Sequence, residues 1–359
     1  MRMKFPEPDI EEFKKVLKRK EKGKRIHIAE LHIDKEILRY LWEDFFGEKW
    51  IEPVDYETKK ETLKSIVTLY YKIGFDVIRL SSEFRFSANL IFDLPKREIN
   101  EGLKRKWAEE KNGYIRNWND FKQYQWPSPE KLDTWVFEYL SEILPENMGI
   151  FLCISYGIFE ILMFLFGFEN LCFQIYDNEG LVKTTAEKIG EIIYESYKKF
   201  IKIEKIIGIF QGDDMGFKTQ TLLPPHFFKK YILPWHKKIS ELCHENNKIY
   251  VLHSCGNIEP LMDFLIEEVK IDAKHSFEDE IMPVWDFKKK YGDKIGIIGG
   301  VDVGKLCSLK ENELRYYIRK ILEKCAGSGY VLGSGNSIAN YVPPENFLIM
   351  LEEGYNFKT

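Results

Sequence analysis

The sequence predicts a (β/α)₈ barrel, an α/β fold in which eight parallel strands alternate with helices. Short apolar runs recur along the chain, and each is followed by a segment with the period of an amphipathic helix. Eight such strand-then-helix units can be distinguished, and this repeated alternation is typical of a parallel sheet. A chain of 359 residues is long enough to form one barrel domain with a large core.

The expected strands are all short and end in polar residues. They lie at 25–31, 75–80, 149–154, 206–210, 249–252, 271–274, 294–298 and 330–332. Helices are expected at 35–42, 58–73, 132–144, 158–168, 185–202, 224–246, 260–269, 283–291, 310–324 and 344–353.

Two segments stand outside this repeat. Residues 1–24 are expected to form an N-terminal helical extension, because apolar residues recur there at helical spacing among lysines. Residues 25–359 then form a single barrel domain. Within it, the stretch from about 85 to 126 is polar, rich in Asn, Lys and Trp, and without a clear period. It is expected to be an insertion after strand two, partly ordered as a hairpin or lid.

Composition excludes several functional classes. The net charge of −4 argues against a nucleic-acid surface, and the basic run Lys14–Lys24 is typical of a solvated helix face. The most hydrophobic stretch, Ile158–Phe168, is about half the length needed to span a bilayer, so no membrane segment is expected. Six scattered cysteines without close pairs, and an N-terminus that does not read as a signal peptide, predict a reduced, cytoplasmic protein.

The motif that organises the site is His253-Ser-Cys255, directly after the apolar run Ile249–Leu252. Residues i and i+2 of an extended chain point to the same side, so the imidazole and the thiolate can converge on one metal ion. Zinc accepts both ligand types but needs about three protein ligands. The alternative is a buried cysteine beside a hydrogen-bonded histidine.

Barrel enzymes place their chemistry at the carboxyl ends of the strands, and the expected strands here end in acids, imidazoles and a thiolate. Each residue alone could simply close a loop by a hydrogen bond. The residues concerned are Glu30, His32, Glu83, Ser155, Tyr156, Gln211, Asp213, Asp214, His253, Cys255, His275, Ser276, Glu278, Asp302, Ser334 and Asn336.

Several further positions could contribute to a site. Glu278 follows the neighbouring strand and could complete a zinc site, with His275 as the weaker candidate, or Glu278 could cap a helix or pair with a lysine. Asp214 could accept a proton, because a like charge on Asp213 raises a pKa, or the pair could hold loop amides. Glycines at 299–300 and 333–335 permit close backbone approach to a ligand.

Seven motifs occur in order along the chain: G-D-D-M-G at 212–216, L-P-W-H at 233–236, L-H-S-C-G-N at 252–257, H-S-F-E-D at 275–279, Y-G-D-K-I at 291–295, G-G-V-D at 299–302, and G-S-G-N-S-I with V-P-P-E-N at 333–346. In order and spacing these motifs resemble the uroporphyrinogen decarboxylase superfamily, particularly its branch of corrinoid-dependent methyltransferases similar to methylcobamide:coenzyme M methyltransferases.

The resemblance implies a (β/α)₈ barrel with zinc held by His253 and Cys255 plus a distant cysteine. This chain has Gly335-Asn336 where that cysteine is expected, so Glu278 is predicted as the substitute ligand, by similarity to cobalamin-independent methionine synthases. Uroporphyrinogen decarboxylases carry an M-R-Q-A-G-R segment after the first strand. Here I-H-I-A-E-L-H-I-D stands there, and its acids would repel a polycarboxylate substrate.

The sequence therefore predicts a zinc-dependent methyltransferase that acts between a small methylated substrate or thiol and a corrinoid (cobalamin) carried by a partner protein. Asp214 or Glu83 would handle protons, whereas Glu30, His32, His275, Asp302 and Asn336 would bind substrate. The alternatives are a decarboxylase or lyase, and a non-enzymatic corrinoid- or metal-binding accessory protein. A homo-oligomer is left open.

Overall fold

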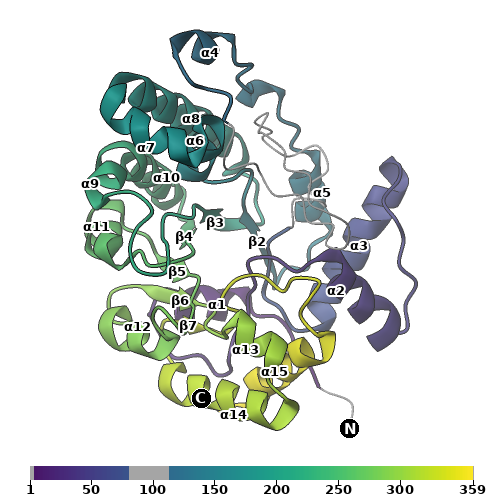
Figure 1. Cartoon of the computed structure of the whole chain (residues 1–359). Helices are drawn as coiled ribbons and strands as arrows, with labels where there is room; N and C mark the ends of the chain where they lie inside the picture. Colours follow the sequence, from purple (N-terminus) through teal and green to yellow (C-terminus); the bar gives the residue numbers. More distant parts are fainter. Residues whose placement is uncertain (1–3, 81–112, 359) are drawn as a thin grey trace.

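Seven parallel strands form one sheet that follows chain order from β1 to β7 and curls around a central core (Figure 1). The computed structural model describes residues 4–80 and 113–358. The strands are β1 Val77–Ile78, β2 Gly149–Leu152, β3 Ile206–Gly212, β4 Ile249–His253, β5 Ala273–His275, β6 Gly296–Ile298 and β7 Tyr330–Val331. Their parallel alignment gathers the carboxyl ends of the strands at one rim.

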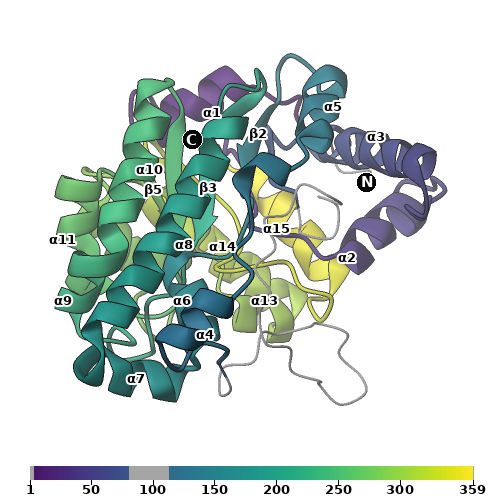
Figure 2. The ribbon, with the colours of Figure 1, turned by 90° about the horizontal axis from the view of Figure 1, so that it is seen from above.

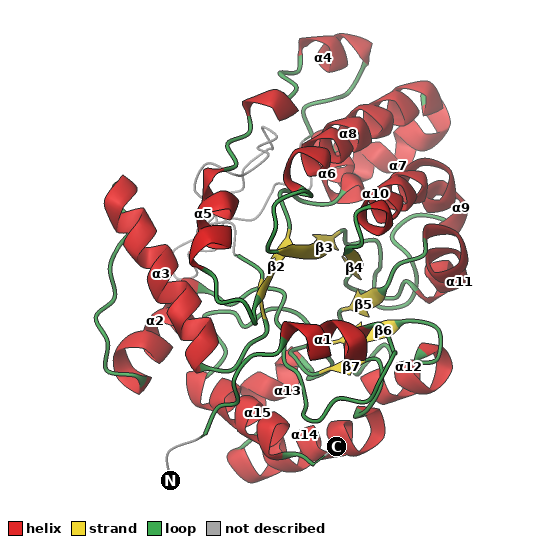
Figure 3. Cartoon of the chain, turned by 180° about the vertical axis from the view of Figure 1, so that it is seen from behind, coloured by secondary structure: helices red, strands yellow, loops and turns green. Residues whose placement is uncertain are grey.

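Helices surround the curled sheet, as Figure 3 shows from behind. They include α2 Lys35–Tyr40, α3 Tyr56–Lys72, α5 Trp135–Ile143, α6 Ile158–Phe166, α7 Phe168–Asp177, α8 Glu179–Phe200, α9 Pro225–Phe227, α10 Leu233–Glu245, α11 Met262–Phe264, α12 Val284–Tyr291, α13 Val303–Ser308, α14 Glu311–Cys325 and α15 Pro344–Asn356. Outward-facing strand residues and the inner faces of these helices make the larger hydrophobic core.

The expected first strand is the main difference from the predicted eight-stranded barrel. In the described part of the chain, residues 25–31 form no ladder and contribute one parallel bridge, between Ile28 and Leu332 beside β7. On the other side, side chains replace the ladder: Arg25 pairs with Asp76 at 2.6 Å, and Arg79 donates to the Leu31 carbonyl at 2.6 Å. The observed fold is thus a curled, barrel-like sheet of seven strands.

The interior of the sheet is a second apolar cluster, closed at one end by helix α1 (Ile10–Leu17). Ile10, Phe13 and Leu17 of α1 pack with inward-facing residues of the strands, such as Phe151 and Phe210. Asp9 caps the helix by accepting from the Glu12 amide at 2.9 Å. The extension predicted at 1–24 therefore contains a helix that fills the end opposite the catalytic rim of a barrel.

The helix expected at 224–246 is interrupted. It divides into α9, a π-helical turn at Phe228–Ile232, and α10. Pro234 stands in the first turn of α10, and its missing amide N–H cannot continue a regular α-helical ladder, which accounts for the break.

The predicted insertion at 85–126 lies largely outside the described residues. Its last part, from 113, carries the short helix α4 (Trp118–Gln123), which Figure 2 shows. Asn117 caps this helix. The Ile115 amide donates to the Leu165 carbonyl at 2.7 Å, which ties this part to the end of α6.

Within 4–80 and 113–358, no single helix is long and apolar enough to cross a membrane. The pair α6 and α7 reaches that length and hydropathy only when joined across a 93° bend, and every residue of α6 is buried in the fold except Glu160, which is half-buried.

Candidate metal centre

Three possible metal ligands converge at the carboxyl ends of β3 and β4. Ligand atoms of Asp214, His253 and Cys255 all lie within 4.8 Å of one another. His253 Nε2 is 3.4 Å from Asp214 Oδ1 and 3.4 Å from Cys255 Sγ. His253 is buried, and the other two side chains are half-buried, so the cluster faces a partly open position at the rim.

The local fold explains why these residues meet. Gly212 of β3 is in register with His253 of β4, so the loops after the two strands leave the sheet side by side. They then cross in close contact: a Cβ on Gly256, whose φ is +73°, would lie 2.3 Å from the Gly216 carbonyl carbon. This crossing lets the Cys255 amide donate to Asp214 Oδ1 at 2.8 Å, which orients the carboxylate toward the cluster.

Hydrogen bonds to His275 fix which nitrogen of His253 faces the cluster. His275 Nε2 lies 3.1 Å from the Ser334 carbonyl, which can only accept, so this nitrogen carries the proton. Burial, together with the charges of His253, Lys274 and Arg79, lowers the pKa of His275 well below its ordinary value and keeps it neutral. Its Nδ1 therefore accepts from His253 Nδ1 at 2.7 Å. His253 Nε2 is left facing the cluster, where it donates to Asp214 when it carries a proton and can ligate a metal once that proton is lost.

The electrostatics around Cys255 oppose an isolated thiolate. Burial, and next the negative charge of Asp214, raises the pKa of this thiol well above its usual range. Burial also acts to raise the pKa of Asp214, but hydrogen bonds from His253 and Cys255 outweigh it and lower that pKa. A carboxylate thus stands beside a thiol that ionises only if a cation joins them.

The donor set fits zinc. Sulfur, imidazole nitrogen and carboxylate oxygen are its usual ligands, and three protein ligands with a fourth position open are typical of catalytic zinc. Ligand atoms about 2.0–2.3 Å from a tetrahedral zinc lie roughly 3.3–3.6 Å from each other. The two 3.4 Å separations at His253 Nε2 match this spacing.

The structure brings several sequence-predicted residues to the cluster. Asn336 Nδ2 donates to Cys255 Sγ at 3.2 Å, from the position where the resemblance led us to expect a cysteine. Asp214, predicted to handle protons, stands instead among the possible ligands. Glu278 lies next to the cluster but is not one of its three members, and its Oε1 accepts from the Gly256 amide at 3.1 Å.

The other predicted site residues have local partners. His32 pairs with Asp34 at 2.8 Å, and Asp302 caps α13 by accepting from the Lys305 amide at 3.0 Å. Glu30 is buried and accepts from the backbone amide and the hydroxyl of Ser334 at 2.8 and 2.5 Å. Glu83 lies outside the described residues.

Glu160 is a neighbour of the site that the sequence analysis missed. It is the one charged residue in the apolar stretch 158–168. A single charge in such a stretch was the feature of the sequence that could have identified Glu160 as a site residue. Burial, and then the charges of Asp214 and Asp213, raises the pKa of Glu160 well above its ordinary value. Asp213 itself is held by the amides of α6 and by His236 at 2.8 Å, so its role is to join α6 to β3.

The buried acid Glu30 gives the first prediction. Burial raises its pKa to about 8, despite two hydrogen bonds from Ser334. The Glu30 carboxyl therefore binds its proton more strongly in the folded state than in the unfolded state. As a result, the free energy of unfolding decreases as pH rises from about 4.5 to 8. Relative to Glu30→Gln, the wild-type free energy of unfolding should fall by up to about 4 kcal/mol over that window. Urea unfolding at pH 5 and pH 8 measures it, and parallel pH profiles would contradict it.

The second prediction concerns the hydrogen bond that orients His253. His275→Phe keeps a ring of similar shape but removes the acceptor for His253 Nδ1, so metal affinity should fall about 10–100-fold. Competition with a chelator of known affinity measures this change. The exposed His226 provides the matched control, because His226→Phe should leave affinity unaltered. Equal affinity in both variants would show that the bond to His275 does not tune the site.

The sequence profile of uroporphyrinogen decarboxylase (URO-D) matches residues 108–356, more than half of the chain. The protein belongs to the uroporphyrinogen decarboxylase family. The family recognised from the seven motifs is thereby confirmed, and membership supports an enzymatic role. The matched region includes Asp214, His253 and Cys255 and extends to α15.

Comparison with solved structures supports the fold of this family member. A methyltransferase from Methanosarcina mazei superimposes with a TM-score of 0.69 at 15% identity, covering 97% of this chain and 98% of the other. A B12-independent methionine synthase from Shewanella sp. W3-18-1, solved with selenomethionine, gives 0.50 at 12% identity, covering 83% and 85%. At such identities the likeness shows a shared barrel-like fold. No curated relative matches the sequence significantly.

Proposed function

We propose that this protein is a zinc-dependent methyltransferase that moves a methyl group between a small methylated substrate or thiol and the cobalt of a corrinoid protein. The observation that carries the proposal is the cluster of Asp214, His253 and Cys255 at the carboxyl ends of β3 and β4. Membership of the family and the barrel fold shared with a methyltransferase add support. The resemblance implies a ligand set of His253, Cys255 and a second cysteine. In this proposal Asp214 supplies the third donor in place of that second cysteine.

Zinc, when bound, would act as a Lewis acid that lowers the pKa of a coordinated thiol or polarises a methyl donor. The residues of the chain prepare the site for this. His253 presents Nε2 because its Nδ1 donates to His275, and Asp214 is oriented by the Cys255 amide. Asn336 and Ser276 donate to Cys255 Sγ at 3.2 and 3.7 Å and thereby temper the charge on the sulfur.

A proton released by a thiol substrate needs an acceptor, and a leaving alkoxide or amine needs a donor. Glu160 suits the donor role, because its raised pKa keeps a carboxyl proton available beside Asp214 for a leaving alkoxide or amine. Its Oε2 accepts from the Gly157 amide at 3.1 Å, which holds the side chain in place. In this proposal the corrinoid arrives on a separate protein in the cytoplasm.

Elemental analysis of the purified protein is the first test, and about one zinc per chain is the expected result. The zinc form is then assayed for methyl transfer to free cob(I)alamin from a panel of methylated thiols, amines and methoxy compounds, and in reverse from methylcobalamin to thiols.

Failure to bind zinc even after reconstitution would overturn the proposal and favour a metal-independent decarboxylase or lyase. Zinc binding with no methyl transfer in either direction would instead favour the accessory protein. Each outcome therefore selects one of the three functions.

A further inference from the structure

Lys274 is a buried cation at an unusual place in the sheet. It is the central residue of β5, and only 5% of it is exposed. Its neighbours Ala273 and His275 face the interior of the sheet, so Lys274 points outward toward the helices. In register beside it are Leu252 and Ile297, both fully buried apolar residues. The lysine therefore lies at a position of the sheet where both neighbouring strands carry apolar residues.

The charge of Lys274 has no ion-pair partner among the described residues. Its Nζ donates to the carbonyls of Ser276 at 2.5 Å and His275 at 3.4 Å, and it lies 4.5 Å from the centre of the Phe277 ring. Burial lowers its pKa to about 8, although Cys255, Glu278 and Asp214 act in the opposite direction. A buried cation whose direct contacts are all neutral is unfavourable, and an anion bound in contact with it would relieve this cost.

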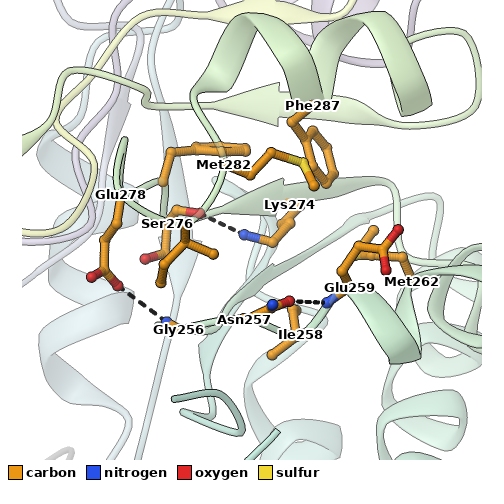
Figure 4. A pocket seen from close by; sticks show the side chains of 12 residues that line it. Gly256, Asn257, Ile258, Glu259, Met262, Lys274, Ser276, Glu278, Met282 and Phe287 are labelled. Atoms are coloured by element: carbon orange, nitrogen blue, oxygen red, sulfur yellow. Dashed lines mark hydrogen bonds between the residues drawn. The ribbon is translucent and has the colours of Figure 1, made fainter. Parts of the chain in front are cut away.

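Lys274 lines a cavity of about 170 Å³ (Figure 4). Its apolar lining includes Ile258, Met262, Phe277, Met282 and Phe287. The figure shows Lys274 among Ile258, Met262, Met282 and Phe287, with its ammonium directed toward Ser276. An apolar cavity with one convergent charged group is the usual form of a small-molecule site.

Two carboxylates also line the cavity, but each has its own partner. Glu278 accepts from the Gly256 amide at 3.1 Å, and Glu259 accepts from Lys290 and from the Tyr291 hydroxyl. Neither is within ion-pair distance of Lys274 in the described structure. Lys274 therefore supplies the one cation that an incoming ligand would meet in the lining.

We propose that this cavity binds a small aliphatic carboxylate, with its carboxyl group on Lys274 and its chain against the methionines and phenylalanines. The volume corresponds to roughly six water-sized groups, at about 30 Å³ each, so a carboxylate of about four or five carbons fits. A single lysine without arginine suits a monoanion, whereas a phosphate dianion calls for more donors. The cavity adjoins the metal cluster, because Gly256 and Ser276 line it and Ser276 donates to Cys255. The proposal for the cavity does not depend on a bound metal.

Titration calorimetry with butanoate, pentanoate and hexanoate tests this site, on protein treated with a chelator so that no carboxylate binds a metal. We expect saturable binding, at least tenfold tighter for pentanoate than for pentanamide. Lys274→Met should weaken pentanoate binding at least tenfold. Lys289→Met removes an exposed charge from neighbouring α12 and should change nothing.

The proposal is overturned if pentanamide binds as well as pentanoate, if Lys274→Met binds normally, or if no carboxylate binds. The comparison of acid with amide uses wild-type protein only, so it holds even if the Lys274 variant fails to fold. Since the metal is removed, the result is independent of methyltransferase activity.

Discussion

Replacing Cys255 by serine should remove bound zinc and methyl transfer together. The serine hydroxyl is a far poorer zinc ligand than a thiolate, so two donors, His253 and Asp214, would remain. Affinity should fall by at least about 100-fold, more than the loss of an outer hydrogen bond produces. Elemental analysis after dialysis measures the zinc, and the cob(I)alamin assay measures activity.

The chain provides a matched control for this change. Cys172 on α7 is half-buried and lies outside the cluster, so Cys172→Ser should keep both zinc and activity. A Cys255→Ser protein that retains one zinc per chain would remove Cys255 from the ligand set. The metal would then have to bind elsewhere.

Replacing Asp214 by asparagine should weaken zinc binding by about 100-fold. The amide preserves the shape of the side chain and can still accept from the Cys255 amide, but it carries no negative charge to attract the ion. Glu278→Gln is the direct comparison. Its oxygen can still accept from the Gly256 amide, and we expect a change of less than about tenfold.

This pair of variants decides between the structure and the sequence prediction. The sequence selects Glu278 as the third ligand, whereas the geometry places Asp214 within reach of both His253 and Cys255. A larger loss in Glu278→Gln than in Asp214→Asn would support the sequence. Zinc titration in the presence of a competing chelator measures both variants on one scale.

Much of the fold follows from local sequence, and the exceptions have physical reasons. Periodicity located seven strands in their correct order, because each is an apolar run bounded by helical segments. Residues 25–31 have the same pattern, but Arg25 and Arg79 bridge the gap to β1 with side chains, which periodicity does not register. The helix predicted at 224–246 is interrupted because of Pro234. This proline is visible in the sequence, but the prediction placed it inside one continuous helix.

The candidate metal centre, too, could be predicted only in part from the sequence. The H-x-C motif identifies His253 and Cys255 because both lie on one strand end, where spacing alone brings them together. The approach of Asp214 depends on the crossing of two loops at Gly216 and Gly256, which is a tertiary contact. Glu160 is brought to the rim by the capping of α6, and no spacing rule connects it with Asp214.

The closure of the sheet interior by α1 has a consequence for the order in which the protein can be completed during synthesis. Ile10, Phe13 and Leu17 need the inward faces of the strands, and the Val16 carbonyl accepts from the Gly329 amide at 2.8 Å, just before β7. Helix α1 thus gains its full set of contacts only after about three hundred further residues, up to β7, have left the ribosome. Until then its apolar face is available to chaperones and to other nascent chains.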